Sequence, residues 1–190
     1  MRVNSIQLYI DETKKCLANG NNLAALIVAL TIPDICGKVL YPNDKTAERY
    51  KKWFDSYIGD YEQSSLEKEK PESERMPYMS GDVFYKLRCS MLHEGTDDIS
   101  SKIQVDNFNL LFGKSGRLES KSIEPRIGYM PDGTIGVIEK VITWNINVYQ
   151  LCEKILWSAE AFLKNECPDA TKIPTIQIYP EIPSIFIVKK

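Results

Sequence analysis

The sequence predicts a mainly α-helical fold, a helical bundle with a small antiparallel β appendage inserted before the last long helix. Apolar residues recur at offsets of three and four over residues 5–95 and again over 147–166, which is the period of amphipathic helices. Between them, at about 102–140, strand-forming residues flank a PDG turn at 131–133. A chain of 190 residues can bury a sizeable core as one unit, so we expect a single domain, 1–190.

Two helices are expected before residue 33. Residues 5–18 combine charges with an apolar face, and NGNN at 19–22 ends the pattern. That apolar face consists of Ile6, Ile10, Thr13 and Leu17. Asn22 can cap the next helix, which is apolar on nearly all sides and should lie in the centre of the bundle. Pro33 should kink or end it, and residues 33–37 then form one more turn that Gly37 closes, without an active-site role.

A third helix is expected to open at Asp44. Its apolar face is formed by Ala47, Tyr50, Phe54, Tyr57 and Ile58. Lysine and arginine on the other side could meet phosphate, but acidic residues are interleaved with them, which favours a solvated face. Residues 60–77 are polar, dense in charge and contain two prolines, so they predict a loop or a frayed helix.

The stretch 79–95, MSGDVFYKLRCSMLHEG, has the strongest helix signal and contains the only histidine. Ser80 is a good N-cap, and Gly95 suits the position after the last turn. The stripe that should face a core consists of Val83, Phe84, Leu87 and Met91. A second side with Tyr85, Cys89 and Leu92 is too apolar for a lone surface helix, so another partner surface is implied.

Arg88 and His93 are the candidate catalytic residues of this helix. An imidazole can exchange protons at neutral pH, and a guanidinium presents a permanently charged fork to phosphate oxygens. Five residues apart, the two side chains are separated by roughly 140° in an ideal helix. They converge only if the last turn unwinds toward Gly95 or if two copies of the helix meet.

The β insert is locally basic, which makes it a secondary candidate for contact with RNA. Its cations are Lys114, Arg117, Lys121 and Arg126. LFGKSG at 111–116 lacks the first glycine of a P-loop, so 113–116 are expected to form a hairpin turn. Asn147 can cap the last helix, and the proline-containing tail, 173–190, is expected to be extended, either as a strand beside the insert or as a partner-binding arm.

Composition excludes several classes of protein. With 43% hydrophobic and 26% charged residues the chain has the balance of a soluble protein. The longest apolar run, 23–30, is too short to span a bilayer and no signal-peptide order is present, so a cytoplasmic location without membrane contact is expected. Scattered cysteines fit reduced thiols, and we expect no metal or other cofactor. A net charge of −2 means that RNA binding would rest on a local patch.

Around Arg88 and His93 the chain resembles the HEPN superfamily, whose nuclease members carry Arg-x(4–6)-His late in a helix of an α-helical bundle. Here the motif reads Arg88-Cys-Ser-Met-Leu-His93 within LRCSMLHEG. IPDICG at 32–37 and RYKKWF at 49–54 also resemble fragments of uncharacterised members, so the resemblance covers roughly the first hundred residues. It implies a metal-independent endoribonuclease of the toxin or phage-defence kind that leaves 2′,3′-cyclic phosphate and 5′-hydroxyl ends. One departure is Cys89, which replaces the polar residue, often Asn, Asp or His, that usually follows the arginine.

Further interpretations stay open. One histidine per chain cannot easily serve as acid and base together, so we expect a homodimer through the 80–94 helix, with an antitoxin protein as another candidate partner. The main alternative is a non-catalytic HEPN-like bundle that binds a protein or nucleotide ligand, which Cys89 favours. In that case His93 is a helix-end cap and Arg88 an edge ion pair. A third interpretation makes Cys89 a nucleophile with His93 as its base, and it needs an orienting third group.

Overall fold

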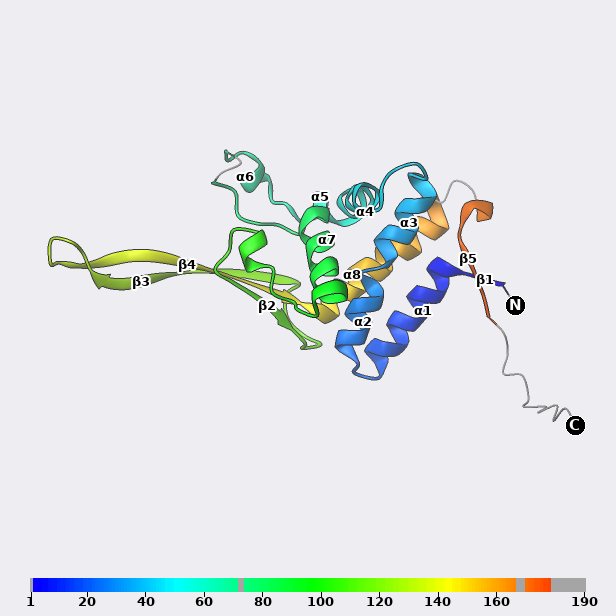
Figure 1. Ribbon diagram of the computed structural model, residues 1–190, viewed down its shortest axis with the longest axis horizontal. Coiled ribbons are helices and arrows are strands. Elements are labelled where there is room, and N and C mark those ends of the chain that lie inside the picture. The colour runs from blue at the N-terminus through cyan, green and yellow to red at the C-terminus, as the bar shows by residue number, and fades with distance from the viewer. Residues whose placement is uncertain (1, 72–73, 167–169, 179–190) are drawn as a thin grey trace, which may run out of the picture.

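The helices form one body that contains α8, and the first and last strands, β1 and β5, lie side by side at its edge (Figure 1). The computed structural model describes residues 2–71, 74–166 and 170–178. The α-helices are α1 Ser5–Ala18, α2 Asn22–Ala29, α3 Ile32–Leu40, α4 Thr46–Phe54, α5 Asp60–Glu62, α6 Ser65–Lys68, α7 Gly81–Cys89 and α8 Val148–Ala161. Helix α8 packs against α1, α2 and α3. About 53% of the chain is helical, which confirms the predicted mainly α class.

Several helices begin and end where the local signals predicted. The apolar face of α1, Ile6 to Leu17, is buried. Ser80 caps α7, because its Oγ accepts a hydrogen bond from the Val83 amide, and Gly95 ends the following turn with φ at 69°. Asn147 caps α8 by accepting from the Gln150 amide at 3.1 Å.

Two predicted caps are wrong by one or two residues. Asn22 is the first residue of α2, and Asn21 occupies the N-cap position without a side-chain bond. Helix α4 begins at Thr46, after Lys45. The carboxylate of Asp44 pairs instead with Lys52 at 2.6 Å, a contact that forms only once the helix has brought the lysine back toward its start. Tertiary charge pairing here replaces the local capping bond.

The IPDICG segment forms a full helix. Pro33 lies in the first turn of α3, where its missing N–H is not needed, and Gly37 is buried in the middle of the helix, so the prediction of a single turn closed by Gly37 is wrong. By length and composition the α2–α3 segment, Asn22–Leu40, could cross a membrane, with a mean hydropathy of 1.9 and 50% of it buried in the fold. The prediction that no apolar segment is long enough to span a bilayer considered only the run 23–30, whereas the helical segment continues to Leu40. A cytoplasmic location stays an expectation.

The β appendage is a three-stranded sheet in the order β2-β4-β3. Its strands are β2 Asn107–Leu111, β3 Glu119–Tyr129 and β4 Ile135–Asn147. Strands β3 and β4 form the predicted antiparallel hairpin, whereas β2 pairs in parallel with the last five residues of β4. Residues 113–116 therefore connect two strands that are not neighbours, so the predicted hairpin turn there is wrong. The sheet also extends to residue 147, beyond the predicted limit of about 140, and leads directly into α8.

The tail does not join that sheet. Its strand β5, Thr175–Gln177, pairs antiparallel with the N-terminal strand β1, Arg2–Asn4, which the sequence analysis did not predict. Ser5 fixes this contact, because its Oγ donates to the main-chain oxygen of Pro174 at 2.8 Å. The rest of the predicted tail, 179–190, and Cys167 among the predicted reduced thiols lie outside the described residues.

Candidate functional site

Helix α4 is packed tightly between α3 and α7 because each of those helices presents a glycine to it. A Cβ at Gly37 would lie 2.5 Å from the main-chain oxygen of Arg49, and one at Gly81 would lie 2.6 Å from that of Lys51. Distances this short leave no room for a side chain and allow backbone to pack on backbone. The three helices thereby bring polar side chains from separate parts of the chain into one cluster.

The first pair of the cluster joins α3 to α4. The Arg49 Nε donates to Asp34 Oδ1 at 2.6 Å, and the two side chains are only 16% and 19% exposed. Arg49 also donates to the main-chain oxygen of Asp44 at 3.4 Å. Charges this far from solvent are tolerated because they are paired. The Asp34 carboxylate is therefore paired with Arg49 and not with Arg88.

Two tyrosines connect this pair with α7. The Tyr50 hydroxyl is buried and makes no hydrogen bond within the described residues. Burial raises the pKa of Tyr50 well above its usual value, and the positive charge of Arg88 opposes that rise. The Tyr85 ring packs edge-on against Tyr50 at 5.4 Å, and its pKa is raised by burial and by the neighbouring Cys89 thiol. Both phenols stay neutral at physiological pH.

Arg88 is half-buried beside these rings. Its guanidinium carbon lies 6.0 Å from the centre of the Tyr85 ring, within cation–π range. The Nε atom is buried and has no acceptor in the described part of the chain. An unpaired buried donor on a permanently charged group is costly, because it has lost its water without gaining a partner. An anionic oxygen placed at this nitrogen would remove that cost.

His93 follows on a π-helical turn, Ser90–Glu94, that continues α7. Such a turn bonds residue i to residue i+5 and so winds less per residue than an α-helix. The angle between Arg88 and His93 is therefore smaller than the roughly 140° of an ideal helix, in the direction that the sequence analysis required. The imidazole is exposed, whereas the arginine is directed toward α4. The structure thus places both residues on one helix end with different degrees of solvent access.

The π-helical turn is held from the side by Lys102. Its Nζ donates to the buried Ser90 Oγ at 2.7 Å and to both carboxylate oxygens of Glu94 at 3.1 and 3.2 Å. Ser90 and Glu94 bracket His93 on either side in sequence. One lysine from a separate segment therefore fixes the backbone from which the imidazole projects.

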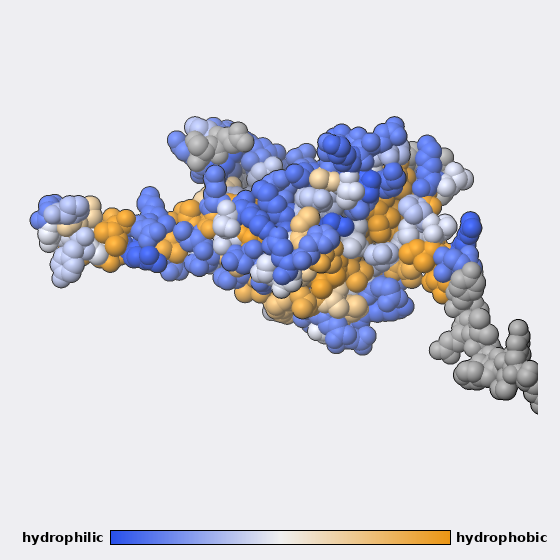
Figure 2. Space-filling model, viewed as in Figure 1, coloured by the Kyte–Doolittle hydropathy of each residue, from blue (hydrophilic) through white to orange (hydrophobic). Residues whose placement is uncertain are grey.

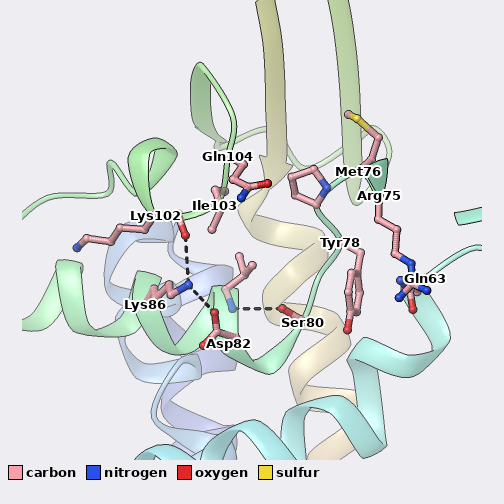
Figure 3. Close-up of a pocket in the computed structure, with 12 residues that line it drawn as sticks. Gln63, Arg75, Met76, Tyr78, Ser80, Asp82, Lys86, Lys102, Ile103 and Gln104 are labelled. Atoms are coloured by element: carbon pink, nitrogen blue, oxygen red, sulfur yellow. Dashed lines mark hydrogen bonds and ion pairs between the residues drawn. The ribbon is translucent and has the colours of Figure 1, made fainter. Parts of the chain in front are cut away.

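A separate pocket of about 460 Å³ opens beside the start of α7 (Figure 3). Asp82 lies within it and pairs with Lys86 at 2.5 Å, and Lys86 also donates to the main-chain oxygen of Lys102 at 3.2 Å. Arg75 and Tyr78 line the opposite wall. Neither Arg88 nor His93 lines this pocket. It is mixed in charge and distinct from the Arg88 cluster.

The second side of the 80–94 helix is only partly covered. Leu92 is 38% exposed, and Tyr85 and Cys89 are half-buried. Met91, which precedes Leu92, lines an apolar hollow of about 480 Å³ together with Leu23, Ile27 and Phe112. Figure 2 shows apolar side chains gathered on the surface around α2 and the end of α7. This surface, made by Leu92, Met91, Leu23, Ile27 and Phe112, is called the α7-end surface below.

The basic insert is less available to RNA than its sequence indicates. Lys121 pairs with Glu119 at 2.9 Å and lies over the Trp144 ring, and Arg126 pairs with Glu139 at 2.7 Å. Lys114 and Arg117 remain exposed in the loop after β2. Two of the four predicted cations, Lys121 and Arg126, therefore form ion pairs with acidic residues of the same sheet.

The cluster includes side chains that the sequence analysis did not assign to the site. Asp34 and Arg49 lie in the fragments IPDICG and RYKKWF, and Tyr50 had been placed only in the apolar face of its helix. Both fragments resemble those of uncharacterised HEPN members, and this resemblance was the sequence signal that could have placed Asp34 and Arg49 in the same site as Arg88. Within the described residues no three His, Cys, Asp or Glu side chains are grouped as metal ligands. No protein-family model, curated protein or solved structure matches this chain.

Proposed function

We propose that this chain is a HEPN-like, metal-independent endoribonuclease, of the toxin or phage-defence kind, with Arg88 and His93 as its catalytic residues. The observation that carries the proposal is the buried Nε of Arg88, which has no acceptor in the described residues and lies at a helix end that also carries the exposed His93. Because Nε is closed to solvent, a phosphate oxygen becomes its acceptor only when the Arg88 side chain turns outward toward His93. Asp34 does not compete for Arg88, because it is paired with Arg49.

The chemistry needs no nucleophile from the protein. The 2′-oxygen of RNA forms a bond to phosphorus while the bond between phosphorus and the 5′-oxygen breaks, which leaves a 2′,3′-cyclic phosphate and a 5′-hydroxyl. One imidazole accepts the proton of the 2′-hydroxyl and another donates a proton to the 5′-oxygen. Arg88 stabilises the charge that accumulates on the phosphate oxygens between these events.

The two imidazoles require two chains, because each chain contains one histidine. We infer a homodimer through the 80–94 helix. Its contact would include the side with Tyr85, Cys89 and Leu92 and the α7-end surface, which is apolar and partly exposed. Leu92→Glu places a charge on this surface, and because Leu92 is 38% exposed the carboxylate can reach water in the separate chain. We expect the variant to melt like the wild type and to show half of its mass by light scattering. An unchanged mass would place the contact between chains elsewhere.

RNA cleavage is expected to persist in EDTA. The Arg88 and His93 side chains supply charge stabilisation and proton transfer directly, and no group of three metal-ligating side chains occurs in the described residues. Cleavage measured before and after chelation should differ by less than twofold, with a magnesium-dependent nuclease as the control. Complete loss in EDTA that magnesium restores would refute this mechanism.

The second candidate function is a non-catalytic HEPN-like bundle that binds a nucleotide ligand. The pocket beside the start of α7 favours it, because Arg75 and Lys86 face a cavity of about 460 Å³ there. Its test is a thermal shift with a nucleoside triphosphate, which Arg75→Ala should abolish. A shift of this kind together with wild-type protein that does not cleave RNA would establish this function over the first.

A further inference from the structure

Strands β3 and β4 form a long arm that projects from the helical body (Figure 1). Strand β2 pairs only with Thr143–Asn147, so the outer part of the hairpin, residues 123–142, has no third strand beside it in the described structure. A two-stranded hairpin in water is at best marginally stable. This arm therefore needs a surface to cover it.

The two faces of the arm differ in character. Along β3 the odd-numbered residues share one face with their partners on β4, and the even-numbered residues share the other. The apolar arm face consists of Ile123, Pro125, Ile127, Tyr129, Ile135, Val137 and Ile142, with Lys140 as its one outer charge. The polar arm face contains Ser120, Ser122, Glu124 and the Arg126–Glu139 ion pair, with Val141 as an apolar residue opposite Glu124. A bulge turns Ile138 onto this polar face, where its side chain lies over Gly128.

The apolar arm face is a continuation of the protein core. At its base Trp144 and Ile146 are fully buried, and Ile142 packs against the core. Farther out the same alternation continues, but Ile127 is 65% and Tyr129 79% exposed. Figure 2 shows apolar side chains along the arm. One face of the sheet is thus covered by the helical body for part of its length and uncovered for the rest.

The uncovered part is as large as one half of a typical protein interface. Five of its side chains expose more than half of their surface, which amounts to on the order of 700 Å² of mainly apolar area. A stable interface buries about 800 Å² per partner. The area therefore matches a complete contact between two such faces.

We propose that this face packs against the same face of a second copy of the chain, about a two-fold axis at the Ile127–Val137 pair. With the axis across the strands, each strand lies over its own copy, so Pro125 of one arm faces Tyr129 of the other and Lys140 faces Ile135. The two Lys140 residues are then about 13 Å apart along the strands, and each lies one strand away from a tyrosine of the other arm. This register keeps the two like charges apart and places apolar side chains opposite one another along the rest of the face.

This contact is independent of the proposed nuclease, because the arm and the α7-end surface are separate. If both two-fold contacts form in a closed assembly, the result is a tetramer of four 21.7 kDa chains. Loss of one contact leaves a dimer through the other. Failure of the arm contact and failure of the α7-end contact therefore give different results.

The test uses the same substitution on the two faces of the arm. We expect Ile127→Glu to halve the mass that light scattering gives for the wild type, and to speed amide exchange over residues 123–129. Ile138→Glu, also at an exposed isoleucine but on the polar arm face, should change neither quantity. Ile127→Glu combined with Leu92→Glu should give monomers that melt cooperatively.

Three outcomes would overturn the proposal. Wild-type protein that stays monomeric would do so, as would an unchanged mass for Ile127→Glu. Equal effects of Ile127→Glu and Ile138→Glu would show that the charge, and not the apolar arm face, changes the assembly.

Discussion

His93→Ala is expected to lower the rate of RNA cleavage by about 10²–10⁴, because it removes the proton-transfer group and leaves the RNA-binding surface in place. The side chain is exposed, so its truncation creates no cavity and the melting temperature should stay within the error of the wild-type value. Cleavage and melting are to be measured on the same preparations. Asp97→Asn, in the exposed loop that follows, is the matched control and should cleave like the wild type.

Arg88→Ala is expected to reduce cleavage by a comparable factor through loss of charge stabilisation on the phosphate. Arg88→Lys separates the two contributions of this side chain, because it keeps the positive charge and loses the planar fork with Nε. Its activity should lie between those of the wild type and the alanine variant. Wild-type cleavage by both alanine variants would refute the assignment of the nuclease site to this motif.

The structural alternative predicts the opposite pattern. In that alternative His93 is a helix-end cap and Arg88 an edge ion pair, although the described residues show no carboxylate partner for Arg88. Alanine at either position should then cost about 0.5–2 kcal/mol of stability. There would then be no wild-type cleavage to lose. Destabilisation together with inactive wild-type protein would favour the non-catalytic bundle.

The parts of the fold that the sequence predicts are those encoded by local signals. The buried face of α1, the Ser80 cap and the left-handed Gly95 each depend on residues within a turn or two of one another. The same holds for Asn147 at the start of α8. Amphipathic period and capping chemistry act over such distances, so the sequence alone contains the required information.

The features that the sequence did not predict depend on contacts between distant segments. The pairing of β1 with β5 joins the two ends of the described chain, and the parallel pairing of β2 with β4 joins residues that are 36 positions apart. In the site, Tyr50 had only the signature of an apolar helix face. Its orphaned hydroxyl near Arg88 follows from how closely α3, α4 and α7 approach, which residue spacing along one helix does not encode.

Gly37→Ala tests that close approach and is expected to destabilise the protein by about 1–3 kcal/mol. Alanine in a helix gains up to about 1 kcal/mol over glycine from propensity, so an open site would become more stable. Here the added Cβ would lie 2.5 Å from the main-chain oxygen of Arg49. Neither backbone can move out of the way without separating α3 from α4, so the steric cost should exceed the gain.

Gly113→Ala is the matched control for this prediction. A Cβ there meets nothing closer than 3.5 Å, and the residue is exposed. Its free energy of unfolding, measured with urea, should equal that of the wild type or exceed it by a few tenths of a kcal/mol. Because separation of α3 from α4 would also pull Asp34 away from Arg49, Gly37→Ala should reduce RNA cleavage as well. A variant at Gly37 that is as stable as the wild type would mean that the two helices are not in backbone contact, and that the cluster around Arg88 is not held by them.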